Sequence, residues 1–253
     1  MRRAIVSDIH ANLEALQVVL AHIDTQRVDR IVCLGDVLGY GPCPVECVDL
    51  VAERCEWSLM GNHDFGVLYE PTNFNLAAEQ AAYWTRERFE AEENKERAAK
   101  RWEFLGRLRV RVGFGDFLCV HGTPRRPINE YLFPEDALNS PVKMQQIFER
   151  VDKYALVGHT HVPGAFTDEP DFYPPDDLEG VYKLNEHEKA IINPGSVGQP
   201  RDMDPRASYA ILDEEQMQVE FHRLEYDVEA AAEKIRSIPE LSDWLGERLL
   251  EGR

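Results

Sequence analysis

The first sixty residues alternate short apolar runs with amphipathic segments, and this pattern constrains the fold most strongly. RAIVS (residues 3–7), RIVCLG (30–35) and EWSLMG (56–61) predict strands. NLEALQVVLAHI (12–23) and VECVDLVAER (45–54) between them predict helices, the second after a proline-rich turn. Strands separated by helices favour parallel pairing, and ligands bind at the carboxyl ends of such strands.

The rest of the chain divides into a helical stretch and a strand-rich part. Residues 75–105 predict helix of mixed charge, either a solvated face or a cap over a site, and we expect them outside the core. Short apolar runs recur from residue 109 to residue 224. Residues 168–179 are acidic and proline-rich, which predicts a mobile surface loop. Asp227 is the predicted N-cap of a C-terminal helix. Without repeats or a clear linker, residues 1–253 predict a single domain.

Charge and composition exclude some classes of function. The chain carries 28 Lys and Arg against 46 Asp and Glu, a net charge of −18. Long-range repulsion, and the lack of a basic stripe with interleaved aromatic residues, disfavour binding to duplex nucleic acid.

The opening MRRAIVSDIH is too quickly polar for a secretory signal, and no window has the apolar length of a membrane span. Five cysteines, an odd number, predict reduced thiols, so we expect a cytoplasmic protein without a membrane partner.

Polar side chains follow five of the predicted strands. They are Asp8 and His10; Asp36; Asn62, His63 and Asp64; His121; and His159 with His161. Taken singly, each has an ordinary explanation as a turn, cap or structural residue. Their coincidence at five strand ends is harder to explain without a shared ligand at that edge.

The chemistry of these side chains points to metal ions. Nitrogen and oxygen donors without cysteine suit Mn, Fe, Zn, Ni or Co. Seven candidate ligands are too many for one ion and suit two ions about 3.5–4 Å apart, with a bridging carboxylate and a bridging water. Such a pair of ions activates the bridging water as hydroxide. It also stabilises the attacking and the leaving oxygen of an in-line displacement at phosphorus. The donor set therefore predicts phosphoester hydrolysis.

At this point the chain resembles a known family. Five motifs occur in the order and approximate spacing of the calcineurin-like metallophosphoesterase superfamily: DIH, GDVLGYG, GNHD, VHG and GHTH. Residues 193–213 resemble the small bacterial branch of predicted phosphoesterases, which includes diadenosine-tetraphosphatase-like proteins. The resemblance implies an α/β fold, a four-layer αββα sandwich of two mixed sheets flanked by helices. The metals are then expected at strand ends near the middle of the sandwich.

The resemblance also implies a role for each ligand. Asp8, His10 and His161 would hold the first metal, and Asp36 would bridge the two. The second metal would be held by Asn62, His121 and His159. We expect manganese first, with iron, zinc, nickel or cobalt as alternatives, since the same ligands accept them all.

Other residues are expected to act on the substrate. His63 would contact the phosphate and donate a proton to the leaving group, and Asp64 would orient His63. Arg201 is the best candidate for a phosphate contact, and Asn193 and Ser196 lie in a turn that could offer further contacts.

Departures from better-known relatives narrow the activity. Protein serine/threonine phosphatases of the superfamily carry arginines before the Asn-His motif and in the GD loop, where this chain has Met60 and VLGYG. The missing arginines disfavour phosphoprotein phosphatase activity.

Three functional hypotheses remain at this stage. The first is a two-metal hydrolase of a phosphodiester or a nucleotide-like phosphoester or pyrophosphate, acting on a small substrate. The second is a non-catalytic metal-binding scaffold on the same fold, comparable to a retromer subunit of the superfamily. The histidine after the metal-binding asparagine favours the enzyme. The third is a single-strand nuclease. Partner proteins leave no signature in the sequence.

Overall fold

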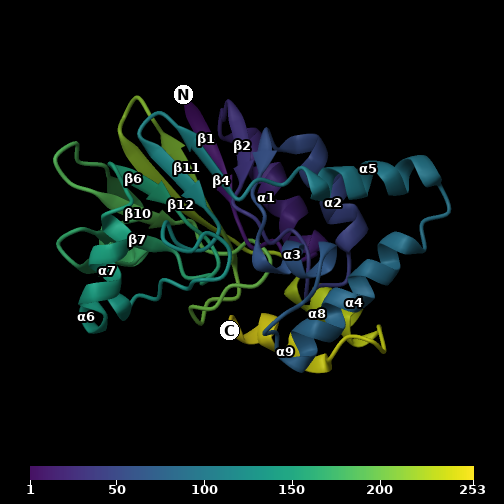
Figure 1. Cartoon of the computed structure of the whole chain (residues 1–253). Helices are drawn as coiled ribbons and strands as arrows, with labels where there is room; N and C mark the ends of the chain where they lie inside the picture. Colours follow the sequence, from purple (N-terminus) through teal and green to yellow (C-terminus); the bar gives the residue numbers. More distant parts are fainter.

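Two six-stranded sheets lie face to face, with helices on their outer faces (Figure 1). The computed structural model describes all residues, 1–253. The first sheet has the order β3 (Trp57–Ser58), β2 (Arg30–Cys33), β1 (Arg2–Val6), β11 (Ala207–Asp213), β12 (Gln218–Leu224) and β9 (Val181–Lys183). The second has the order β4 (Arg111–Phe114), β5 (Phe117–Val120), β6 (Tyr154–Leu156), β10 (Ala190–Asn193), β7 (Gly164–Thr167) and β8 (Asp171–Tyr173).

Each sheet combines a parallel part with an antiparallel part. In the first sheet, β1, β2 and β3 run parallel, and β11, β12 and β9 add antiparallel pairs. In the second sheet, β5, β6 and β10 run parallel, and β4, β7 and β8 pair antiparallel. The parallel parts bring the carboxyl ends of β1, β2, β5 and β6 toward one region between the sheets. The predicted fold, two mixed sheets flanked by helices, is confirmed.

The helices cover the outer faces and leave the apolar layer between the sheets to side chains of the strands. Their bounds are α1 (Leu13–Thr25), α2 (Pro44–Arg54), α3 (Asn62–Leu68), α4 (Leu76–Glu90), α5 (Lys95–Gly106), α6 (Asp136–Asn139), α7 (Pro141–Phe148), the 3₁₀ helix η1 (Pro175–Leu178), α8 (Val228–Arg236) and α9 (Asp243–Glu251). No helix has both the length and the hydrophobicity that spanning a bilayer demands. As predicted, Asp227 caps α8, its side chain accepting from Ala230 N–H at 3.0 Å.

Alternation along β1 shows how the layers are separated. Ala4 and Val6 pack toward α1 and α2, whereas Ile5 between them points into the layer between the sheets. Successive side chains of a strand point to opposite faces, so a strand covered on both faces is apolar throughout. The apolar residues Ala4, Ile5 and Val6 therefore lie in a central strand of a covered sheet.

The helical stretch 75–105 is part of the core rather than outside it, which corrects the expectation from its charge pattern. It forms α4 and α5, and Phe89 and Leu105 are fully buried in the same cluster as α1 and α2. Arg101, 6% exposed, binds Asp49 of α2 through two nitrogens at 2.7 and 2.8 Å. The charged residues are solvated on one face, while a few large apolar side chains on the other dock both helices.

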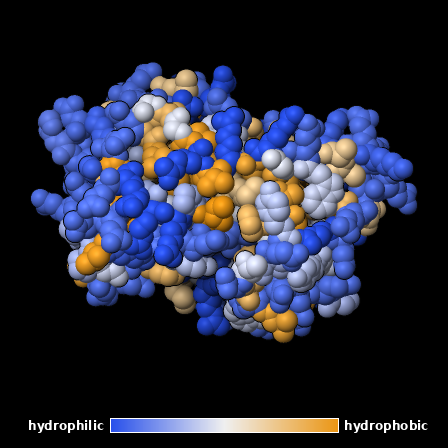
Figure 2. Space-filling model, viewed as in Figure 1, coloured by the Kyte–Doolittle hydropathy of each residue, from blue (hydrophilic) through white to orange (hydrophobic).

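The acidic segment 168–179 has more structure than the predicted loop. It contains β8, which pairs with β7 through Thr167 and Asp171 at the sheet edge, and then η1. Phe172 packs on Phe166, with ring centroids 4.7 Å apart, and this aromatic contact helps to hold the segment in place despite its composition. The face in Figure 2 is mainly hydrophilic around a smaller group of hydrophobic residues, as expected from the charge of −18.

Candidate metal centre

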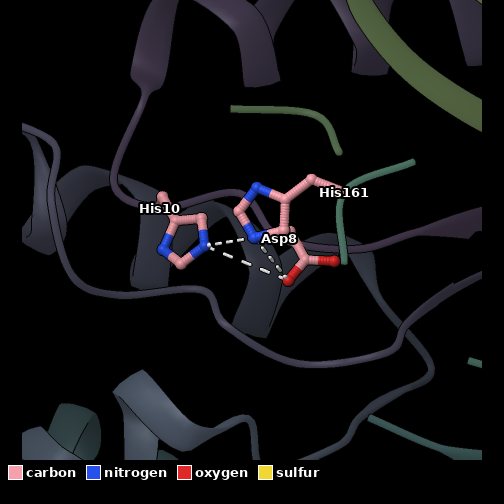
Figure 3. Close-up of side chains that lie close together, drawn as sticks. All are labelled: Asp8, His10 and His161. Carbon is pink, nitrogen blue, oxygen red and sulfur yellow. Dashed lines mark hydrogen bonds and ion pairs between the residues drawn. The ribbon is translucent and has the colours of Figure 1, made fainter. Parts of the chain in front are cut away.

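The loop after β1 meets the loop after β6 between the two sheets (Figure 3). Asp8 Oδ1 lies 3.3 Å from His161 Nε2 and 3.9 Å from His10 Nε2. The two imidazole Nε2 atoms are 3.2 Å apart. These three side chains point toward one another, almost completely buried, and could hold a single cation.

A second group adjoins the first through Asp36. Asp36 Oδ2 lies 3.3 Å from His121 Nε2 and 3.7 Å from His10 Nε2. His159 and His121 form a cluster with this carboxylate, within reach of one ion. Asn62 Oδ1 is 3.3 Å from His121 Nε2. All seven predicted ligands therefore come together, with Asp36 between the two groups.

Backbone carbonyls orient three of the imidazoles. Nδ1 of His10 faces the carbonyl of Leu38 at 3.0 Å, and Nδ1 of His161 faces that of Gln199 at 2.5 Å. His121 uses the carbonyl of Leu34 in the same way, at 3.0 Å. A carbonyl only accepts, so each Nδ1 carries a proton, and in the neutral ring Nε2 directs a lone pair into the centre. This is the arrangement that metal-binding histidines adopt.

The charges of the site require a cation. Asp8 and Asp36 are at most 1% exposed. Burial opposes their ionisation, but nearby histidines outweigh it and hold both pKa values well below the usual range. Burial likewise opposes protonation of His121, yet the charges of Asp36 and Asp8 raise its pKa to about 9. Two buried carboxylates without a paired cation are costly, so a proton or a metal ion must balance them.

Unpaired atoms support the same conclusion. Asp36 Oδ2 and His159 Nε2 are buried without a hydrogen-bond partner, although buried polar atoms are normally paired. Both belong to the second group of ligands. The orphaned atoms, the facing lone pairs and the N/O donor set fit two divalent cations.

The backbone at the site is strained, and the ligands themselves carry the strain. Five of the seven predicted ligands adopt left-handed φ between 48° and 69°: Asp8, His10, Asp36, His159 and His161. This conformation costs about 1–2 kcal/mol for an ordinary residue. It is typical of functional sites, where the surrounding structure holds side chains in a required position.

His63 lies in the first turn of α3, beside the ligands. Its ring centroid is 4.8 Å from that of His10 and 4.2 Å from that of Tyr40. Gly39, with φ +85°, passes so close that a Cβ there would lie 2.3 Å from His63 Nδ1. Burial lowers the pKa of His63 to about 4, so the ring is neutral near pH 7 in the absence of bound anions.

Asp64 does not make the predicted contact with His63. Its carboxylate accepts three backbone N–H groups, those of Asp36 at 2.8 Å, Gly61 at 3.0 Å and Leu38 at 3.1 Å. His63 Nδ1 is buried and has no hydrogen-bond partner. The expectation that Asp64 orients His63 is corrected: the carboxylate holds the loop that carries Asp36, because three convergent N–H donors lie on that side.

Asn193 and Ser196 are also revised, from substrate contacts to positioning residues. Both are fully buried. Asn193 donates to the Gly158 carbonyl and to Thr160, in the loop that carries the paired histidines. Ser196 donates to the Asp8 carbonyl at 2.7 Å and accepts from Gln199 N–H. With their polar groups engaged inside the protein, neither offers one to a substrate.

A cavity of about 310 Å³ opens beside the second group of ligands. It is lined by Tyr40, Asn62, His63, Thr72, Asn73, Phe74, Asn75, Ala78, Asn129, Tyr131 and His159. The Tyr131 ring stacks on His159, with centroids 3.8 Å apart. Sequence reasoning missed Tyr131 and Tyr40, because no local pattern marks a loop aromatic that meets the site only after folding.

The protein is a two-sheet sandwich with buried clusters of His and Asp at the ends of its strands. This is the architecture of a metal-dependent phosphoesterase. The chain belongs to the calcineurin-like phosphoesterase superfamily, whose domain model matches residues 1–217. The chain is a hydrolase of this superfamily, and the resemblance inferred from the five motifs is confirmed.

Three similar proteins span nearly the whole chain. An uncharacterised protein of Methanocaldococcus jannaschii is 39% identical over 257 residues, covering 99% of this chain and 98% of its own. The crystal structure of a metallophosphoesterase from Sphaerobacter thermophilus is 39% identical, with a TM-score of 0.84 over 100% of this chain and 99% of its own. A hypothetical protein from Pyrococcus horikoshii shares the fold at 18% identity, with a TM-score of 0.77, covering 100% of this chain and 98% of its own.

Proposed function

We propose that this protein hydrolyses a small phosphodiester, or a nucleotide-like phosphoester or pyrophosphate, with two metal ions. One observation carries the proposal: Asp36 lies within reach of His10 from the first ligand group and also forms a group with His121 and His159. Asp8, His10 and His161 would hold one ion, and Asn62, His121 and His159 the other. Manganese is our first expectation for both. When bound, the two cations supply Lewis-acid activation of water and of the phosphoryl group.

His63 is the proposed proton donor to the leaving group. Its ring borders both the ligand groups and the cavity, so a substrate in the cavity meets it. A bound phosphate anion favours the protonated imidazole and would raise the pKa of His63 from about 4 toward neutrality. The protonated ring can then donate to the departing oxygen.

The cavity supports a nucleotide-like substrate. Its volume of about 310 Å³ lies at the lower end of small-ligand sites. Asn73 and Asn129 supply amide groups, and Tyr131 and Phe74 supply aromatic faces. Amides can hydrogen-bond a base edge, and aromatic faces can stack on it. The net charge of −18 favours small substrates over a duplex.

Replacement of His63 tests this proposal. We expect His63→Ala to retain two metal equivalents by elemental analysis while turnover of bis(p-nitrophenyl) phosphate falls about 10²–10⁴-fold. His187→Ala is the matched control, since the His187 side chain is 85% exposed. Full activity of His63→Ala would exclude the proton-donor role. Absence of bound metal in the unaltered protein, with no activity after manganese is added, would overturn the proposed function.

We further propose that residues 1–253 act as a single domain whose helical insertion, 75–105, limits substrate size. Asn75 and Ala78, at the start of α4, line the cavity. Deletion of the segment would expose the core around Phe89 and Leu105, so a point change is the better test. Ala78→Leu should narrow the cavity and reduce kcat/KM more for thymidine 5′-p-nitrophenyl phosphate than for bis(p-nitrophenyl) phosphate. Equal losses for both would indicate a folding role.

A further inference from the structure

Two arginines from distant parts of the chain approach the same tyrosine ring. The guanidinium carbons of Arg201 and Arg248 each lie 5.9 Å from the centroid of Tyr40. Arg201 follows the second sheet's central strand β10, whereas Arg248 belongs to α9 and lies beyond residue 217, where the match to the family model ends. Arg248 was not a candidate at the level of sequence, because nothing near it in the chain marks a site.

Neither guanidinium forms an ion pair with an Asp or Glu side chain. Arg201 donates to Gln199 Oε1 at 2.9 Å and to the Tyr40 hydroxyl at 3.5 Å, and its Nε is buried without a partner. Arg248 donates to the backbone oxygen of Arg253 at 2.8 Å, and its guanidinium carbon lies 4.5 Å from the centroid of the Trp244 ring. In a chain with 46 acidic and 28 basic residues, two neighbouring arginines without an Asp or Glu partner require an explanation.

The nearby acidic side chains are engaged elsewhere. Asp202, next to Arg201, pairs with Arg223. Asp204 pairs with Arg206 at 2.6 Å. Burial and the charge of Arg201 together lower the pKa of Arg248 to about 10, as expected for a partly buried cation beside a second cation.

Tertiary packing holds the two arginines in place. Leu245 and Leu249 of α9 pack in one cluster with α4 and Tyr40, and Figure 1 shows α8 and α9 beside α4. Met203 N–H donates to the Gly252 carbonyl at 2.9 Å, which joins the end of α9 to the loop after Arg201. The guanidinium groups are thus presented from fixed elements and are not free surface side chains.

Tyr40 places the pair next to the metal centre. Its ring centroid is 4.2 Å from that of His63 and 4.7 Å from that of His10. An anion held by the arginines would therefore lie one side chain away from a phosphoryl group at the ligand clusters. Guanidinium groups bind phosphate oxygens in bidentate fashion.

We propose that Arg201 and Arg248 form a second anion subsite, which binds a phosphate group adjacent to the one held at the metal centre. The substrate class that fits both positions is a nucleotide-like compound with at least two linked phosphate groups. This inference rests on the proposed function, because it takes the metal centre as the site of the first phosphate.

Calorimetric titration of the metal-loaded protein tests the subsite without requiring turnover. The probes are AMP, with one phosphate, and α,β-methylene-ADP, with two phosphorus groups and a linkage that resists hydrolysis. We expect the second probe to bind the unaltered protein more tightly. Arg248→Met and Arg201→Met should each weaken its binding about 10-fold or more and weaken AMP binding less than about twofold.

Controls separate folding, charge and catalysis. Arg236→Met removes an exposed arginine of α8 and should leave both affinities unchanged. Metal content and thermal unfolding verify that each variant is folded. The inference is overturned if α,β-methylene-ADP binds no more tightly than AMP, or if Arg248→Met and Arg201→Met weaken both probes equally or neither. If the two probes bind as predicted but the metal-loaded protein hydrolyses no phosphoester, the proposed function is rejected. The anion subsite is then still supported.

Discussion

Gly61 lies directly against the carboxylate of Asp36. A Cβ at Gly61 would be 1.9 Å from Asp36 Oδ1 and 2.4 Å from Asp36 N, so only glycine fits. The same Oδ1 accepts the N–H of His63 at 2.8 Å, which fixes the carboxylate that lies between the two ligand groups. The start of α3 and the loop after β2 are thereby packed as one unit.

We therefore expect Gly61→Ala to displace Asp36 and weaken metal binding. A loss of about 10–100-fold in metal affinity is typical when a metal ligand loses its support. Elemental analysis after dialysis against limiting manganese measures this. Gly106→Ala is the matched control, because a Cβ at Gly106 meets nothing within 4 Å. Normal metal content in Gly61→Ala would contradict the role assigned to this contact.

Removal of metal should destabilise the protein, because the carboxylates of Asp8 and Asp36 would then lack their balancing cations. At a metal concentration 100 times Kd the bound ion contributes about 2.7 kcal/mol. For a chain of this size a chelator should thus lower Tm by about 5–10 °C. Differential scanning calorimetry measures the shift, and Asp8→Asn should show a smaller one. Identical melting with and without chelator would argue against a metal centre.

Replacement of Asp64 distinguishes the role seen in the structure, holding the loop of Asp36, from the role predicted from sequence, orienting His63. Asp64→Asn leaves one oxygen and an NH₂ group facing the N–H donors of Asp36, Gly61 and Leu38. We expect a loss of about 1–3 kcal/mol in the free energy of unfolding together with reduced metal content. Urea denaturation and elemental analysis provide both readouts. If Asp64 acted only through His63, metal content would stay normal and only the pH–rate profile would move.

Acid should destabilise the protein partly through His222. Its ring stacks on Tyr209, whose hydroxyl lies 2.7 Å from His22 Nδ1. Burial and the charge of His22 lower the pKa of His222 below 6.5, although Glu220 opposes them. The unfolded chain then binds the proton more readily than the folded protein. The stability that the neutral His222 ring contributes is therefore complete above pH 6.5 and is lost as the pH falls below that value.

The pH dependence is measured by urea denaturation of chelator-treated protein between pH 7 and pH 5. The difference between the unaltered protein and His222→Gln isolates the one imidazole. We expect the variant to lose less stability on acidification, by at most about 1.4 kcal/mol per pH unit, the limit for one proton. Parallel curves for the two proteins would show that His222 does not contribute.

The sequence by itself determined the central part of the fold and marked the candidate ligands. Apolar runs such as the one before Asp8 form covered strands, and polar residues after parallel strands must converge at one edge of a sheet. His159 and His161, which follow one such strand, could therefore be grouped with the other candidate ligands at that edge. The cap at Asp227 was equally predictable, since capping depends on residues within one turn.

Only the tertiary structure decided contacts between segments that are distant in the chain. Asp64 meets the loop of Asp36, and Asn193 and Ser196 are buried under the ligand loops, so their predicted roles required correction. Arg248 reaches Tyr40 from α9, more than two hundred residues away. Local spacing predicts which face of an element a side chain occupies, but long-range packing decides what that face meets.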